Sequence, residues 1–92
     1  MAFHPKAVYK ILPHMEPGRE YTTMELQSVV DLPRQSLRIQ MAHMVPYYLE
    51  RRKVKGGKNN RYTYMYHLTP FGEDVRAQLL NIRSKYGSNQ DN

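Results

Sequence analysis

The sequence of 92 residues contains no cysteine and no tryptophan, and only two phenylalanines. Without cysteine the chain can form neither a disulfide bond nor a thiolate metal site, which excludes a disulfide-stapled secreted module and favours a reducing compartment. Long apolar runs are also missing, whereas a membrane-spanning helix requires roughly 18–20 apolar residues. The residues Met1–Pro5 show no basic segment followed by an apolar one. We therefore expect a cytoplasmic protein that neither crosses a membrane nor is secreted.

The length is that of one domain, because a typical domain has about 100–150 residues around one hydrophobic core. Hydrophobic residues make up 40% of the chain, which is enough for a core, and charged residues make up 24%. The last five residues are all polar and offer no apolar anchor. We expect a single folded domain over residues 1–87 and a disordered tail over residues 88–92.

Acidic residues are scarce relative to basic ones: 14 lysines and arginines oppose 8 aspartates and glutamates, a net charge of +6. The segment from Pro33 to Tyr62 holds eight of the basic residues and a single glutamate, so it carries +7 and the remainder of the chain −1. A solvated surface with mixed charges would spread both signs along the chain. The segregation therefore favours contact with a polyanion such as nucleic acid.

Hydrophobic spacing predicts two helices in the first third of the chain. The first begins at Pro5, is limited by Pro13, and carries apolar residues at helical intervals, namely Ala7, Val8, Ile11 and Leu12. A loop at Pro17-Gly18 separates it from a second helix, which opens with a capping box between Thr22 and Glu25. We expect the buried side of the second helix to consist of Leu26, Val29 and Val30, with Met24 as a further core residue.

A third helix is expected from Arg34, after a turn at residues 31–33. At about 100° per residue, one sector of this helix holds its large side chains, which are Leu37, Met41, Met44 and Tyr48. Pro46 has no amide hydrogen to donate, so the helix either bends there or ends near Val45 and restarts through residues 47–49.

A hairpin is expected after the third helix. Glycine and asparagine over residues 56–60 suit its tip, and residues 61–68 alternate as in a β-strand. One face of that strand carries Tyr62, Tyr64 and Tyr66. We expect these tyrosines to pack in the core, because the chain has no tryptophan to fill it. Alternatively, a row of aromatic rings beside basic residues is a stacking platform for single-stranded nucleic acid.

The last predicted helix begins with Thr69 as its N-cap and Pro70 in its first turn, and it runs to Gly87. The apolar side of this helix is wider than one small core can cover. We therefore expect a homodimer that forms through Val75, Leu79, Leu80 and Ile82.

Three stretches, taken with the order of the predicted elements, carry a resemblance to a known family. Leu32–Leu37, followed by Met41, is similar to the turn and start of a DNA-recognition helix, and Leu49–Val54 is similar to its end. Tyr66–Gly72 contains the pattern Y-x-L-T-x-x-G, which resembles the exit from the wing in small bacterial and phage regulators. Over roughly residues 20–86 the chain therefore resembles a winged helix-turn-helix domain of the multiple-antibiotic-resistance or phenolic-acid-decarboxylase repressor type.

The resemblance implies a mostly helical α+β fold, with a recognition helix over about residues 34–45 and a wing over about residues 54–68. The implied function is sequence-specific binding of double-stranded DNA by a small transcriptional regulator, a repressor at the nucleoid. The residues expected to contact bases are Gln35, Ser36, Arg38, Ile39 and His43; glutamine can pair with adenine and arginine with guanine. The residues expected to contact phosphates are Thr23, Arg34, Arg51, Arg52, Lys53, Lys55, Lys58, Asn60 and Arg61.

Catalytic and metal chemistry find little support in the sequence. The four histidines show no metal-ligand spacing, and no carboxylate pair stands beside one, so we expect no metal, no cofactor and no enzymatic activity. Two other functions remain open at this level: interaction of the same fold with a protein partner, and binding of single-stranded nucleic acid or RNA by the tyrosine face.

Overall fold

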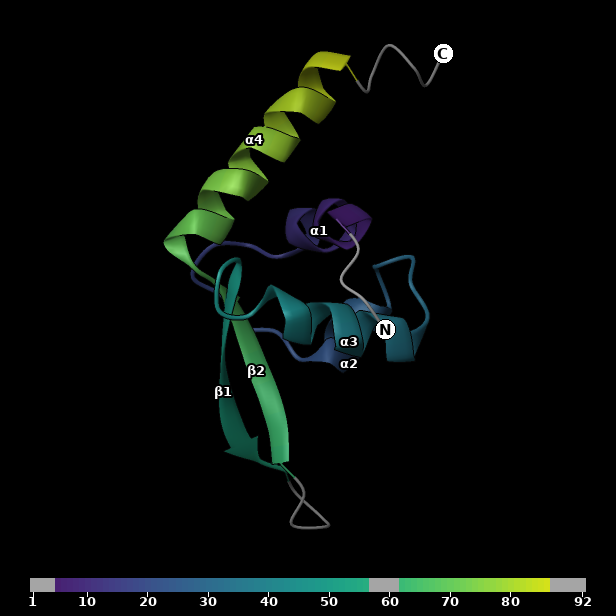
Figure 1. Cartoon of the computed structure of the whole chain (residues 1–92), viewed down its shortest axis with the longest axis vertical. Helices are drawn as coiled ribbons and strands as arrows, with labels where there is room; N and C mark the ends of the chain where they lie inside the picture. The colour runs from purple at the N-terminus through teal and green to yellow at the C-terminus, as the bar shows by residue number, and fades with distance from the viewer. Residues whose placement is uncertain (1–4, 57–61, 87–92) are drawn as a thin grey trace.

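The computed structural model describes residues 5–56 and 62–86, which form a small α+β fold (Figure 1). In chain order the elements are α1 (Pro5–Ile11), the 3-10 helix η1 (Leu12–His14), α2 (Thr23–Gln27), α3 (Arg34–Met44), β1 (Leu49–Lys55), β2 (Tyr62–Leu68) and α4 (Pro70–Tyr86). In Figure 1 the helices α1, α2 and α3 form one body, the hairpin of β1 and β2 extends from it downward, and α4 rises on the other side. The predicted class, α+β and mostly helical, is confirmed.

The capping box, the glycine turn and the proline that limits the first helix are all present in the first third of the chain, as predicted. The hydroxyl of Thr22 accepts a hydrogen bond from the amide of Glu25 at 3.1 Å, and the amide of Thr22 donates to the Glu25 carboxylate at 2.8 Å, which completes the capping box. The loop before α2 turns at Gly18, whose φ of +80° favours glycine. Pro13 lies in η1, so the α-helical hydrogen bonding of α1 ends before it.

The core lies where α1, η1, α2 and α3 meet the base of the hairpin. Its fully buried side chains are Ile11, Leu12, Met15, Leu26, Leu37, Met41, Met44 and Leu49. Two predictions for the second helix are wrong, because Met24 and Val29 are exposed. Met24 lies about 200° from Leu26 in a helical projection and therefore points away from the core. Because α2 ends at Gln27, helical spacing no longer applies to Val29.

The segment around Pro46 ends the third helix and does not restart it. α3 stops at Met44, the Val45–Pro46 peptide bond is cis, and residues 45–48 form a turn. Leu49 then begins β1 and pairs with Leu68 of β2, and both side chains are buried. The predicted restart through residues 47–49 is wrong, as is the assignment of residues 49–54 to the end of a helix. The first strand therefore begins five residues earlier than the predicted wing at 54.

Only the base of the hairpin reaches the core. Tyr66 is buried, and its backbone exchanges two hydrogen bonds of 2.8 Å with Tyr21, which adds a short bridge to the sheet edge. Tyr64 is 37% exposed and Tyr62 is 60% exposed. The prediction that all three tyrosines of this face pack in the core is therefore confirmed for Tyr66 and wrong for the other two, because the outer half of the hairpin extends past the helices.

The start of α4 is held by a residue pair from the predicted wing exit. The Thr69 hydroxyl accepts a hydrogen bond from the Gly72 amide at 2.9 Å and donates one to the carbonyl of Tyr47. A Cβ on Gly72 would lie 2.0 Å from the carbonyl oxygen of Tyr48, so only glycine fits there. The threonine and the glycine of the pattern therefore join α4 to the turn that follows α3.

Candidate nucleic-acid interface

A groove of about 700 Å³ runs between α3, the start of α2 and the inner face of the hairpin. Its lining residues are Thr22, Thr23, Met24, Arg34, Gln35, Arg38, Ile39, Ala42, Arg51, Tyr62, Thr63, Tyr64 and Tyr66. Among these described residues three are arginines and none is acidic. The groove is therefore a positively charged surface with aromatic side chains on one wall.

The α3 wall presents the side of the helix that turns away from the core. Leu37, Met41 and Met44 bury the opposite side, which leaves Gln35 and Arg38 exposed at the groove. Arg34, Ile39 and Ala42 also line it. Of the predicted base contacts, the structure brings Gln35, Arg38 and Ile39 together in the groove. Ser36 and His43 are not among its lining residues.

The hairpin face that carries the tyrosines also carries two cations that stack on their rings, and one of these cations, Arg51, lines the groove. The guanidinium of Arg51 lies 4.1 Å from the centroid of the Tyr64 ring, and the Lys53 ammonium lies 4.8 Å from the centroid of Tyr62. In the strand register Arg51 stands opposite Tyr66 and Lys53 opposite Tyr64, so each cation reaches diagonally to the next tyrosine toward the tip. A tyrosine ring has no net charge to cancel that of the cation. Both positive charges thus remain available to an anion.

Arg52 differs from its neighbours in β1. Its guanidinium donates two hydrogen bonds to the carboxylate of Glu20, from Nε at 2.7 Å and from Nη2 at 2.8 Å. The hydrogen bond from Arg52, together with its charge, lowers the pKa of Glu20 below the usual value for a glutamate. The structure therefore does not place Arg52 with the predicted phosphate contacts, because a carboxylate neutralises it outside the groove.

The remaining predicted phosphate contacts fall into three groups. Thr23 lines the groove from α2, although its hydroxyl points to the sulfur of Met41 at 3.9 Å. Lys55 is exposed at the end of β1. Lys58, Asn60 and Arg61 lie outside the residues that the structure describes. Met24 is 68% exposed and lines the groove, as do the outer two tyrosines, although the sequence pattern predicts all three in the core.

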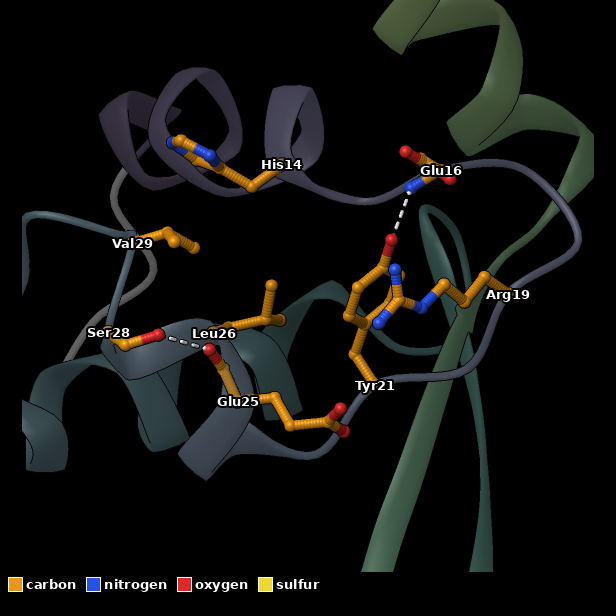
Figure 2. Close-up of a pocket in the computed structure, with 8 residues that line it drawn as sticks. All are labelled: His14, Glu16, Arg19, Tyr21, Glu25, Leu26, Ser28 and Val29. Carbon is orange, nitrogen blue, oxygen red and sulfur yellow. Dashed lines mark hydrogen bonds between the residues drawn. The ribbon is translucent and has the colours of Figure 1, made fainter.

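Figure 2 shows a second hollow, of about 400 Å³, on the other side of α2. Its lining residues are His14, Glu16, Arg19, Tyr21, Glu25, Leu26, Ser28 and Val29. The polar groups bond mainly to one another: the Glu16 amide donates to the Tyr21 hydroxyl at 2.9 Å, and the Arg19 guanidinium lies 4.9 Å from the Tyr21 ring centroid. With two glutamates and one arginine this hollow has no excess of positive charge, so it does not suit a polyanion.

Over residues 5–56 and 62–86 no group of three or more acidic, histidine or cysteine side chains is placed to hold a metal ion. No helix in the same ranges combines the length and apolar character needed to cross a bilayer. Comparisons of the chain with protein-family models, with curated proteins and with solved structures give no match.

Proposed function

We propose that this chain is a winged-helix domain that binds double-stranded DNA, with α3 in the major groove and the hairpin along the sugar–phosphate backbone. The observation that carries the proposal is the groove itself, which joins Gln35 and Arg38 of α3 to Arg51 of the hairpin on one surface. These side chains come from two separate elements. Because an acidic residue is missing among the described lining residues, the whole surface attracts the phosphates of DNA.

The α3 side of the groove supports direct contact with bases. An α-helix with its side chains is about 10–12 Å across and fits the major groove of B-form DNA, and the 11 residues of α3 make it about 16 Å long. Gln35 carries an amide that can bond two atoms of adenine, and Arg38 carries a guanidinium that can bond two atoms of guanine. Ile39 beside them offers an apolar contact to a thymine methyl group. The helix therefore presents the side-chain types that distinguish base pairs.

The hairpin side supports contact with phosphates. Arg51 and Lys53 are held over tyrosine rings, which restricts their side chains before DNA arrives and lowers the entropy lost on binding. Phosphate contacts fix the register of a protein on the duplex but carry no sequence information. Such a domain would act as a small transcriptional regulator, with repression by occupancy of its site as the simplest mode.

The proposal is tested by selection of bound fragments from a random duplex library at about 150 mM salt, where nonspecific binding is weakened. We expect a short enriched motif. Arg38→Glu should lower affinity for that motif about tenfold or more, because it removes a base contact and adds a repulsive charge. Lys6→Glu makes the same change of charge on α1, outside the groove, and should leave the affinity nearly unchanged. Equal losses in both variants would contradict the assignment of α3 as the recognition helix.

A second candidate, binding of single-stranded nucleic acid, is favoured by the exposed rings of Tyr62 and Tyr64. One face of each ring is covered by a cation, so at most the other face is free to stack on a base. Base stacking on an aromatic side chain contributes about 1–3 kcal/mol per base. Tyr64→Leu would then weaken single-strand binding at least severalfold, whereas for a duplex binder we expect a small change. Titration of the wild type and this variant with a labelled oligonucleotide and its duplex separates the two functions.

A further inference from the structure

The tyrosine face of the hairpin changes from buried to exposed along β2. Tyr66, at the base, is 4% exposed, Tyr64 is 37% exposed and Tyr62 is 60% exposed. All three residues line the groove beside α3. Figure 1 shows that the outer half of the hairpin extends past the helical body. The ring surface that is free to bind a ligand therefore increases with distance from the core.

The exposed apolar surface of α4 rests on one of the residues expected at a dimer contact. Val75 and Leu79 pack against the core and Leu80 is half-buried, whereas Ile82 is 54% exposed. The homodimer stays a prediction. The outer tyrosines of the hairpin differ from Ile82, because they line a groove that also carries positive charge.

One face of each exposed tyrosine ring is covered by a cation from β1. Arg51 lies over Tyr64, at 4.1 Å from the ring centroid, and Lys53 lies over Tyr62, at 4.8 Å. The helices α2 and α3 lie beyond the opposite edge of β2, where Tyr21 bridges to the strand (Figure 1). The uncovered ring faces therefore turn toward the groove, with a positive charge behind each ring.

The two walls of the groove suit two different forms of DNA. In a duplex the bases are stacked on one another, so only their edges reach a protein, and Gln35 and Arg38 of α3 are the side-chain types that pair with such edges. The face of a tyrosine ring gains little from a duplex, whose outer surface consists of phosphates and sugars. An unpaired strand exposes the faces of its bases, which stack on aromatic side chains with little regard to sequence.

We propose that the chain binds the junction at which double-stranded DNA opens into a single strand, with α3 on the duplex and unpaired bases stacked on Tyr64 and Tyr62. The inference rests on the proposed function, because it keeps α3 on a duplex, and it names the form of DNA that the whole groove accepts. Along β2 the two tyrosines are about 7 Å apart, twice the step of about 3.4 Å between stacked bases, so one strand can reach both rings. Arg51 and Lys53 attract the phosphates of the same strand.

Equilibrium binding of the full chain to a set of DNA probes at about 150 mM salt tests the proposal. The probes share one duplex sequence, which is blunt, extended by a thymidine tail, or extended by an equally long tail of abasic nucleotides, with tails at the 3′ and the 5′ end in turn. The free thymidine strand completes the set. The abasic tail has the phosphates of the thymidine tail but no bases, so the comparison separates stacking from charge.

We expect the thymidine-tailed duplex, in at least one polarity, to bind about fivefold or more tightly than the abasic-tailed duplex, since stacking of a single base contributes that much. The free thymidine strand should bind more weakly than the tailed duplex, because it lacks the contacts with α3. Equal affinities for the two tailed duplexes in both polarities would overturn the proposal.

Variants of the tyrosines assign the effect to their rings. Tyr62→Leu combined with Tyr64→Leu should lower the affinity for the thymidine-tailed duplex to that for the abasic-tailed duplex, which should itself change little. Phenylalanine at both positions keeps the rings and removes the hydroxyl groups, so it should retain the preference for the thymidine tail. Tyr9→Leu is the matched control, because Tyr9 is 54% exposed on α1, outside the groove. Equal losses on both tailed duplexes would mean that the rings only hold the cations, which would overturn the proposal.

The same probes keep the junction apart from the proposed duplex binding. A wild type that binds the blunt duplex, loses this binding on Arg38→Glu and shows no preference for the thymidine tail refutes only the junction. A free thymidine strand that binds as tightly as the tailed duplex, with no effect of Arg38→Glu on either, refutes both, because α3 then contributes nothing to binding.

Discussion

The two halves of the β1–β2 hairpin have the same backbone structure and opposite surroundings. At the base, Leu49 and Leu68 are paired and buried, and Tyr66 bonds to the backbone of Tyr21. In the outer half, Arg51 and Lys53 stack on tyrosine rings that are themselves exposed. One continuous ladder therefore joins a part that packs against the helices to a part that projects beside α3.

This difference separates the two roles of the hairpin. Changes at the base should alter the free energy of unfolding, because they disturb buried contacts. Changes in the outer half should leave stability nearly constant, since exposed substitutions usually shift it by less than about 0.5 kcal/mol, and should act on binding instead.

The largest effect is expected at the base, where α4 meets the turn before β1. In Gly72→Ala the new Cβ would lie 2.0 Å from the carbonyl oxygen of Tyr48, so the helix start or the turn must move. We expect a loss of about 3 kcal/mol or more in the free energy of unfolding by urea titration. Gly18→Ala is the control: it meets no atom within 4 Å, and only its positive φ opposes the substitution, for about 1 kcal/mol. Equal losses would show that the close contact at the base is unimportant.

An intermediate effect is expected in the outer half, from two neighbouring arginines. Arg51→Ala removes a cation of the groove and should reduce the slope of log K against log salt for duplex DNA by about 0.9, with a severalfold loss of affinity. Arg52→Ala removes a cation that is already paired with Glu20 outside the groove, so we expect little change in either quantity. Fluorescence anisotropy at several salt concentrations measures both. A larger loss in Arg52→Ala would mean that the outward face of the hairpin meets the DNA.

Elements that depend on near neighbours in sequence could be predicted. The capping box of Thr22 and Glu25, the N-cap at Thr69 and most of the buried stripe of the third helix need only local spacing, and they are present. Tyr48, predicted on the same stripe, is the exception, because α3 ends at Met44 and Tyr48 lies in the turn that follows. The sequence also located the α3 side chains of the groove, because a helical projection needs no knowledge of the rest of the fold. Gln35 and Arg38 were found in this way.

Features that depend on where distant elements end could not be predicted. Alternation identified the face that carries Tyr62 and Tyr64, but the point at which the hairpin leaves the helices depends on the size of the helical body. Similarly, residues 49–54 are compatible with a helix or a strand until Leu49 pairs with Leu68. The pairing of Arg52 with Glu20 joins residues 32 positions apart, so no local sequence pattern predicts it.

The smallest effect on stability is expected from the ion pair of Glu20 and Arg52, and this effect depends on pH. The hydrogen bond and charge of Arg52 lower the pKa of Glu20 in the folded chain, so the unfolded chain takes up the proton first as the pH falls. The stabilisation is present above the ordinary pKa of a glutamate and is lost as the pH falls through the lower folded value. Both side chains are partly exposed to solvent, which keeps the contribution small. Thermal melts of the wild type and Glu20→Gln should thus differ slightly at neutral pH and converge in acid. A difference that grows on acidification would mean that Glu20 stabilises the fold when protonated, and the hairpin would then be positioned by a contact other than this ion pair.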